Sequence, residues 1–187
     1  NNNLTGTFPA QYSEWTRLMV LSVFLNGLTG ILPTELGALT DSVSLQVDQN
    51  FLSGSLPSEL GLMTALSWLD MNTNAFSGKL PTEMGRMTKL TYLFLDSNSL
   101  EGTLPTELGN LISLKWLSFG ANSFTGSLPT EFGKLTSVET FYAHTNGFTG
   151  TLPAQLAEWN DIQIFSVYQN RLTGTIHAAL GTWMALE

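Results

Sequence analysis

The sequence predicts an α/β solenoid, a chain wound into stacked coils, and two regularities carry this prediction. The motif Asn-x-(Leu/Phe)-x-Gly occurs eight times in 187 residues, at a constant interval of 24 residues. All seven prolines keep the same interval, from Pro9 to Pro153. A fixed period of this length indicates coils that contact only their neighbours, not a globular core around a buried active site. Function is therefore expected on the outer faces, in columns of residues 24 apart.

The repeat at residues 66–90 shows how each element is predicted. Leu69 and Met71 alternate with residues of other types, which is the period of a strand with one buried face. Pro81 fixes its φ angle and favours the start of a short helical turn. Met84 lies within that turn and is expected to fill the outer side of the core. The repeat pattern therefore predicts one strand and one short helical turn in each coil.

The asparagine after each strand is predicted to bond to backbone groups of adjacent coils. A side-chain amide both donates and accepts hydrogen bonds, so a column of asparagines satisfies polar groups that the turns bury. We therefore predict a structural asparagine ladder, formed by Asn26, Asn50, Asn74, Asn98, Asn122, Asn146 and Asn170.

The full pattern L-x-x-L-x-L-x-x-N-x-L-x-G-x-L-P-x-E-L-G-x-L-T-x-L resembles the plant-type leucine-rich repeat over essentially the whole chain. The segment 28–40, LTGILPTELGALT, fits best. The resemblance implies a right-handed solenoid with a parallel sheet on its concave face, often a second strand at the side of each coil, and short helical turns on its convex face. The family includes receptor-like proteins and receptor-kinase ectodomains of plants, with related proteins in algae. It implies protein or peptide recognition outside the cell or at the cell surface.

Residues 1–187 are predicted to be a single leucine-rich-repeat domain of about seven to eight coils, and a piece of a longer protein with flanking repeats or caps. Terminal repeats are often atypical, and His177 here replaces the usual proline. Ser42 stands where a core leucine is expected, which predicts a weakened second coil.

Composition argues against several partners and chemistries. The formal net charge is −8 at pH 7 and the seven basic residues are scattered, so nucleic acid is not an expected partner. The chain has no cysteine, which removes disulfides and thiolate metal sites. No apolar run approaches the roughly 20 residues of a membrane span. No cofactor is expected.

The concave strands predict a row of aromatic side chains. Neighbouring strands lie about 4.8 Å apart, so residues 24 apart form ladders. Exposed aromatic residues edged by carboxylates are typical of a binding surface. The predicted ligand-binding residues are Trp68, Tyr92, Trp116, Phe94, Tyr142, Asp48, Asp70, Asp96, His144 and Tyr168.

These residues predict a non-enzymatic extracellular module that binds a protein or peptide on its concave face. The carboxylates favour a cationic partner, and a glycan is a second ligand class, since sugars also stack on tryptophan and tyrosine. Three alternatives stay open. In the first, the aromatic row only stabilises the sheet through cross-strand pairs. A structural or surface-binding solenoid, similar to ice-binding proteins, would use serine and threonine of the side strands, such as Thr149 and Thr151. A polysaccharide-binding or enzyme-inhibiting module would use the same concave aromatics.

No catalytic residue and no metal site is predicted. His144 and Asp96 are two coils apart, about 10 Å by the strand spacing, whereas a hydrogen bond reaches about 3 Å. Asp48, Asn72 and Asp96 share a column, but three ligands fall short of the 6–8 oxygens that calcium takes.

Overall fold

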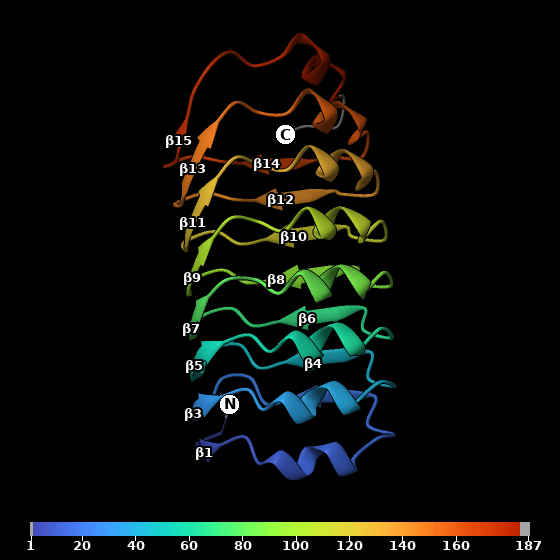
Figure 1. The fold of residues 1–187 in the computed structure, drawn as a ribbon, viewed down its shortest axis with the longest axis vertical. Coiled ribbons are helices and arrows are strands. Elements are labelled where there is room, and N and C mark those ends of the chain that lie inside the picture. Colours follow the sequence, from blue (N-terminus) through green and yellow to red (C-terminus); the bar gives the residue numbers. More distant parts are fainter. Residues whose placement is uncertain (1, 184–187) are drawn as a thin grey trace.

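The computed structural model describes residues 2–183, which form a right-handed leucine-rich-repeat solenoid. The coils stack along one axis from the blue N-terminal end to the red C-terminal end in Figure 1. Two parallel sheets and a column of short helices run the length of this stack. The fold class predicted from the repeat is therefore confirmed.

The concave sheet has seven parallel strands that pair in a register of 24 residues. Trp68 lies opposite Tyr92, and Tyr92 lies opposite Trp116. This register confirms the ladders expected from the sequence. The strands are β2 (Val20–Ser22), β4 (Ser44–Gln46), β6 (Trp68–Asp70), β8 (Tyr92–Phe94), β10 (Trp116–Ser118), β12 (Thr140–Tyr142) and β14 (Ile164–Ser166).

The side sheet, along the left edge of Figure 1, has eight strands and a different register. Thr7 lies opposite Thr29, and Ile31 lies opposite Ser53, so partners are 22 residues apart. Equivalent residues of neighbouring coils are thus displaced by two positions along the strand, roughly 6–7 Å. The serine and threonine residues are therefore staggered from coil to coil and do not align in columns of residues 24 apart. The strands are β1 (Thr5–Thr7), β3 (Gly27–Ile31), β5 (Phe51–Ser55), β7 (Ala75–Gly78), β9 (Ser99–Gly102), β11 (Ser123–Gly126), β13 (Gly147–Gly150) and β15 (Arg171–Leu172).

The convex face carries one short 3-10 helix in each coil. Proline precedes seven of these helices in an extended conformation, as its restricted φ favours. His177 replaces proline before the last helix, and its Nδ1 accepts a hydrogen bond from the Ala179 N–H at 3.1 Å. The helices are η1 (Ala10–Glu14), η2 (Thr34–Ala38), η3 (Ser58–Leu62), η4 (Thr82–Arg86), η5 (Thr106–Asn110), η6 (Thr130–Lys134), η7 (Ala154–Glu158) and η8 (Ala178–Thr182).

The core is a continuous strip between the sheets and the helices. Leu69, Met71 and Met84 are fully buried, as their spacing predicted. Ser42 is also fully buried, and its hydroxyl donates a hydrogen bond to the Leu18 carbonyl of the preceding coil. The polar group at this core position is therefore satisfied, which offsets part of the cost of the missing leucine.

The asparagine ladder connects each coil to the one before it. The Asn98 side chain accepts from the Phe76 N–H at 3.0 Å and donates to the Met71 carbonyl at 3.0 Å, both in the preceding coil. It also donates to the Leu95 carbonyl of its own coil at 3.1 Å. Both cross-coil bonds recur at Asn50, Asn74, Asn122, Asn146 and Asn170, and Asn26 accepts from the Leu4 N–H. The predicted structural role of these side chains is therefore observed in the structure.

The residue before each ladder asparagine has a left-handed backbone conformation. These φ angles lie between 51° and 55°, although none of the residues is glycine. Such a conformation costs roughly 1–2 kcal/mol per residue and persists only where surrounding bonds fix it. The residues are Leu25, Gln49, Thr73, Ser97, Ala121, Thr145 and Gln169.

Candidate functional site

The aromatic row is a continuous band across four neighbouring strands, β6 to β12. Ring centroids are 5.4 Å apart for Trp68 and Phe94, 5.5 Å for Phe94 and Trp116, and 5.9 Å for Trp116 and Tyr142. Tyr92 lies beside Trp68, with centroids 4.6 Å apart. All five side chains are half-buried, so they stabilise the sheet through cross-strand contacts and still present surface to solvent.

The two tryptophans of this band carry unsatisfied indole groups. The Nε1 atoms of Trp68 and Trp116 are buried and have no acceptor within residues 2–183, and the Ser44 hydroxyl is buried in the same way. A buried donor without an acceptor costs about 1–3 kcal/mol. Buried groups without a protein partner are bonded to ordered water in many proteins, and they also occur at functional sites.

The carboxylates of Asp48, Asp70 and Asp96 lie near the band. Burial raises the pKa of two of them, Asp70 and Asp96. Burial raises the pKa of Asp70 to about 6, assisted by the nearby charges of Asp48 and Asp96, while a hydrogen bond from the Asn72 N–H opposes the shift. Asp48 is 8% exposed, so the expectation that it presents its charge on the outer surface is wrong. Its carboxylate accepts from the Gln49 side chain at 3.0 Å.

Asp70 makes the stability of the fold depend on pH. Because its pKa is raised from 3.8 to about 6 on folding, the folded state binds more protons in this interval, and stability falls as pH rises from about 4 to about 6. We expect Asp70→Asn to reduce this fall in the free energy of unfolding by about 1–2 kcal/mol, a figure that allows for the partial exposure of the carboxylate. Urea unfolding of wild type and variant at pH 4 and pH 7 measures the difference. An unchanged pH dependence would contradict the shift, and exposed Asp161→Asn is the control.

A hollow of about 430 Å³ lies beside the aromatic band, at the carboxyl ends of strands β6 to β12. Aromatic side chains form one wall and polar residues of the turns form the other. Thr73 and Ser97, two of the left-handed residues, lie in the polar wall. The lining residues are Asn72, Thr73, Phe94, Asp96, Ser97, Trp116, Ser118, Tyr142 and His144.

Gly120 brings Asp96 and His144 together within this hollow. A Cβ at Gly120 would lie 2.6 Å from Nε2 of His144 and 3.0 Å from Oδ1 of Asp96. The two side chains therefore converge over a residue that has none, and the separation of about 10 Å predicted from the strand spacing is wrong. Strand spacing describes backbone positions, whereas these side chains lean toward each other from both sides.

The carboxylate of Asp96 is held in place by two hydrogen bonds. The Ser118 hydroxyl donates to Oδ2, and the Gly120 N–H donates to Oδ1 at 2.8 Å. Burial raises the pKa of Asp96, and these two bonds and the nearby His144 oppose the rise. The Asp96 N–H in turn donates to Oδ1 of Asn72 at 2.7 Å.

This arrangement does not resemble a nucleophilic triad. Ser118 is only 3% exposed, and its hydroxyl donates to a carboxylate. A nucleophilic serine instead donates to a histidine. The His144 ring stacks on Tyr168 at 4.7 Å, and its Nδ1 is 3.3 Å from the Thr145 hydroxyl. Among the described residues, no group of three or more His, Cys, Asp or Glu side chains is placed to hold a metal ion.

The structure brings most of the predicted residues into one region. Trp68, Tyr92, Phe94, Trp116 and Tyr142 form the band, while Asp96 and His144 meet in the hollow. Tyr168 lies beyond His144 and is 59% exposed. Sequence reasoning missed Ser118, Asn72, Thr73 and Ser97 as lining residues, and it missed the role of Gly120. The one available signal was a glycine in a column otherwise occupied by larger side chains.

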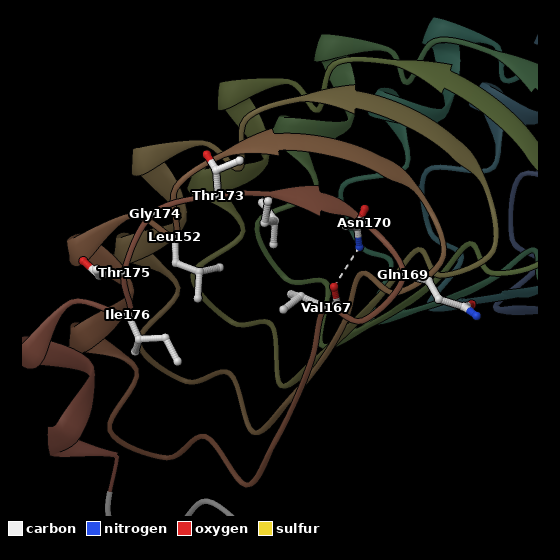
Figure 2. Close-up of a pocket in the computed structure, with 9 residues that line it drawn as sticks. Leu152, Val167, Gln169, Asn170, Thr173, Gly174, Thr175 and Ile176 are labelled. Atoms are coloured by element: carbon white, nitrogen blue, oxygen red, sulfur yellow. Dashed lines mark hydrogen bonds between the residues drawn. The ribbon is translucent and has the colours of Figure 1, made fainter.

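A second hollow, of about 350 Å³, lies at the C-terminal end of the stack (Figure 2). Leu152, Val167 and Leu172 line it, together with Ile176, which is 77% exposed. In the inner coils, the residues equivalent to Leu152, Val167 and Leu172 are buried. Examples are Leu104, Leu95 and Leu100, respectively. The hollow therefore lies at the C-terminal end of the core strip, and Figure 2 shows the side chains that line it.

No helix in the described part of the chain combines the length and apolar character needed to cross a bilayer.

The fold and its concave surface define a repeat protein with a half-buried aromatic band, and comparison with known families specifies the type of repeat. The Leucine Rich Repeat family model matches residues 89–111 and 113–135. No curated protein sequence matches the chain. The chain therefore carries leucine-rich repeats, and its fold is that of plant leucine-rich-repeat ectodomains.

Solved structures show the same solenoid. The chain is similar to the leucine-rich-repeat ectodomain of the plant membrane receptor kinase GASSHO1/SCHENGEN3 from Arabidopsis thaliana, with a TM-score of 0.98 and 35% identity, over 100% of this chain and 22% of that chain. It is similar to the plant peptide hormone receptor RGFR1, with a TM-score of 0.98 and 30% identity, over 99% of this chain and 30% of that chain. A plant ice-binding protein matches with a TM-score of 0.67 and 25% identity, over 94% of this chain and 72% of that chain. This chain thus spans less than a third of either receptor chain.

Proposed function

We propose that this chain is an extracellular, non-enzymatic recognition module that binds a peptide or protein segment along its concave face. The observation that carries the proposal is the aromatic band from Trp68 to Tyr142, which leads into a hollow with a carboxylate. Aromatic side chains supply much of the binding energy in protein interfaces, and their half-buried rings are already ordered before binding.

Two of the similar structures are receptors in complex with a partner. The GASSHO1/SCHENGEN3 ectodomain is in complex with CASPARIAN STRIP INTEGRITY FACTOR 2, and RGFR1 is in complex with RGF2. These likenesses support ligand recognition by the present solenoid and an extracellular location. They also favour a peptide over a glycan as the first ligand to test.

The chemistry of the band suits an extended peptide. The half-buried rings of Trp68 and Trp116 present aromatic surface against which the backbone and side chains of a peptide can pack. The net charge of −8 and the carboxylates beside the band favour peptides with positive charge.

Selection from a random peptide library displayed on phage tests the proposal. We expect wild type to enrich a family of related peptides and the double variant Trp68→Ala, Trp116→Ala to lose at least roughly 100-fold in affinity for them, since two hot-spot residues are removed. Affinities are measured by fluorescence anisotropy of the labelled synthetic peptides. Thermal unfolding verifies that the double variant is folded at the assay temperature. A double variant that destabilises the fold is replaced by Trp116→Leu.

The matched control lies on the side sheet. Thr149 and Thr151 are exposed there, so Thr149→Arg with Thr151→Arg should leave peptide affinity unchanged. Peptides that bind the tryptophan variants as well as wild type would show that the band only packs the sheet. Peptides lost only by the threonine variant would move the site to the side sheet. Failure to enrich any peptide would contradict peptide recognition by this segment.

Binding to an ordered surface such as ice is a second candidate. Thr149 is exposed in β13, Thr151, Thr173 and Thr175 are exposed just beyond the ends of β13 and β15, and a plant ice-binding protein shares the fold. The two-residue stagger between coils and the charged side chain of Lys79, also exposed on this sheet, make the surface less regular than a repeating crystal plane. We therefore favour the concave face.

A further inference from the structure

We propose that the hollow between Phe94 and His144 is a subsite for a positively charged side chain, a lysine or arginine of the bound peptide. This inference rests on the proposed function and adds the chemistry of one position of the ligand. Three properties of the hollow carry it: an anchored carboxylate, aromatic walls, and the lack of a competing strong base among the lining residues.

The first property is the anchored carboxylate of Asp96. Each of its oxygens accepts one hydrogen bond, from the Ser118 hydroxyl and from the Gly120 N–H. A carboxylate oxygen accepts two, so one acceptor position on each oxygen is still available. This geometry suits a guanidinium group, which donates two parallel N–H bonds, and also a single ammonium group. Because both bonds fix the carboxylate, little side-chain order is lost when a cation binds.

The second property is the aromatic wall. Trp116 has Phe94 on one side, with centroids 5.5 Å apart, and Tyr142 on the other side at 5.9 Å. The rings are tilted by 55° and 47°, so the wall curves rather than presenting one flat stack. Aromatic faces attract a cation within about 6 Å of the ring centroid, most strongly for tryptophan. The wall therefore favours the same charge as the carboxylate.

The third property is the charge balance of the hollow. Its nine lining residues include no lysine or arginine, so Asp96 has no strongly basic partner there. Lys115 lies next to β10 but is paired with Glu139 at 2.7 Å. His144 is the one titratable base in the lining, and its ring is held by stacking on Tyr168. A ligand cation would provide a strongly basic partner for Asp96, in addition to the weakly basic His144.

A metal ion fits this hollow less well. Asp96 is the one carboxylate of the lining, and a hard cation takes six or more oxygens. The curved aromatic wall offers no oxygen ligand apart from the Tyr142 hydroxyl.

NMR titration of the isotopically labelled protein with two amino acids blocked at both ends tests the subsite directly. The probes are N-acetyl-arginine methylamide and its uncharged isostere, N-acetyl-citrulline methylamide, monitored by the indole N–H signals in NMR spectra. We expect saturable shifts of the Trp116 signal with the arginine probe and none with the citrulline probe. Asp96→Asn keeps the size of the side chain and should weaken binding of the arginine probe roughly tenfold or more, because a charge-assisted hydrogen bond is lost. Asp161→Asn, an exposed change outside the hollow, should leave it unchanged.

A tethered cation gives a second, independent test. Ser97 is exposed at the rim of the hollow, so Ser97→Lys places an ammonium group next to it without altering the core. This variant should bind the arginine probe more weakly, whereas Ser97→Gln, of similar length without charge, should bind it more strongly than Ser97→Lys. Equal binding by both variants would contradict a charge-selective subsite.

Failure of this inference is separable from failure of the proposed function. Peptides that depend on Trp68 and Trp116 but bind Asp96→Asn as well as wild type would overturn the cation subsite and leave peptide recognition intact. An arginine probe that does not bind, or that binds no better than citrulline, would overturn it as well. Two results with the selected peptides would support it. Replacing a lysine or arginine of the peptide by glutamine should lower affinity as much as Asp96→Asn does. Combining the two changes should lower affinity no further.

Discussion

Replacing Asn98 with leucine should lower the free energy of unfolding by about 3 kcal/mol or more, one of the two largest effects expected in this chain. The substitution removes the acceptor of the buried Phe76 N–H at 3.0 Å and the donors to the Met71 and Leu95 carbonyls. Each buried backbone group left without a partner costs about 1–3 kcal/mol. The larger apolar side chain recovers only part of this loss. Urea unfolding followed by circular dichroism measures the change.

Asn2 supplies the matched control, because it occupies the first position of the same 24-residue ladder and is exposed. Asn2→Leu should change the unfolding free energy by less than about 0.5 kcal/mol. A loss at Asn98 as small as that at Asn2 would show that water or relaxed backbone satisfies the turns, and that the ladder is not a main source of stability.

The ladder also fixes the position of the proposed site. Asn98 donates to the Asp96 carbonyl at 3.2 Å. Ser97, between these two residues, has a left-handed conformation and lines the hollow. The carboxylate of Asp96 therefore starts from a backbone segment held on both sides. The same segment is also bonded to both neighbouring coils, because the Thr73 N–H donates to the Asp96 carbonyl at 2.9 Å and the Ser97 N–H donates to the Gly120 carbonyl at 3.0 Å.

The repeating elements were predictable from the sequence because each relies on local chemistry repeated in phase. The alternation at Leu69 and Met71 defines the buried face of a strand, and the 24-residue interval places Trp68, Tyr92 and Trp116 on one ladder. A single repeat would leave these assignments ambiguous. Eight repeats of one motif remove the ambiguity, since an accidental pattern does not recur at the same positions.

Features that depend on geometry between coils were not predictable. The 22-residue register of the side sheet results from how the turns connect two sheets, and no residue type marks it. The left-handed positions carry residues as different as Leu25, Gln49 and Ala121, so their conformation follows from the bonds of the ladder and not from glycine propensity. The solvent exposure of Asp48 depended on the packing of neighbouring coils in the same way.

The meeting of Asp96 and His144 shows why the candidate site was only partly predictable. Both residues were expected in the binding column, but a column gives backbone positions alone. Their convergence requires the missing side chain of Gly120, where a Cβ would lie 2.6 Å from the His144 ring. It also requires the Ser118 hydroxyl, which turns the Asp96 carboxylate toward Gly120. Sequence patterning predicts which face carries the site, whereas side-chain contacts decide its shape.

Gly61→Ala is expected to have the other large effect on stability, because helices η3 and η4 approach each other at this residue. A Cβ at Gly61 would lie 2.3 Å from the carbonyl oxygen of Glu83 and 2.6 Å from its carbonyl carbon. These are backbone atoms, so no side-chain rotation relieves the clash, and the two coils must separate on the convex face. Overpacking typically costs about 1–3 kcal/mol and more where backbone must move, so we expect about 3 kcal/mol in urea unfolding.

Gly181→Ala separates this clash from the general effect of alanine in a helical turn. Gly181 occupies the equivalent position in η8, where a Cβ would meet no described atom within 4 Å, and alanine there should leave stability unchanged or slightly raised. Equal losses at both positions would show that close approach is not the cause. A loss confined to Gly61 has a functional consequence, because convex spacing sets the curvature of the concave sheet. Separation of η3 from η4 would change the angle between β6 and β8, and with it the contact of Trp68 with Tyr92 at the start of the aromatic band.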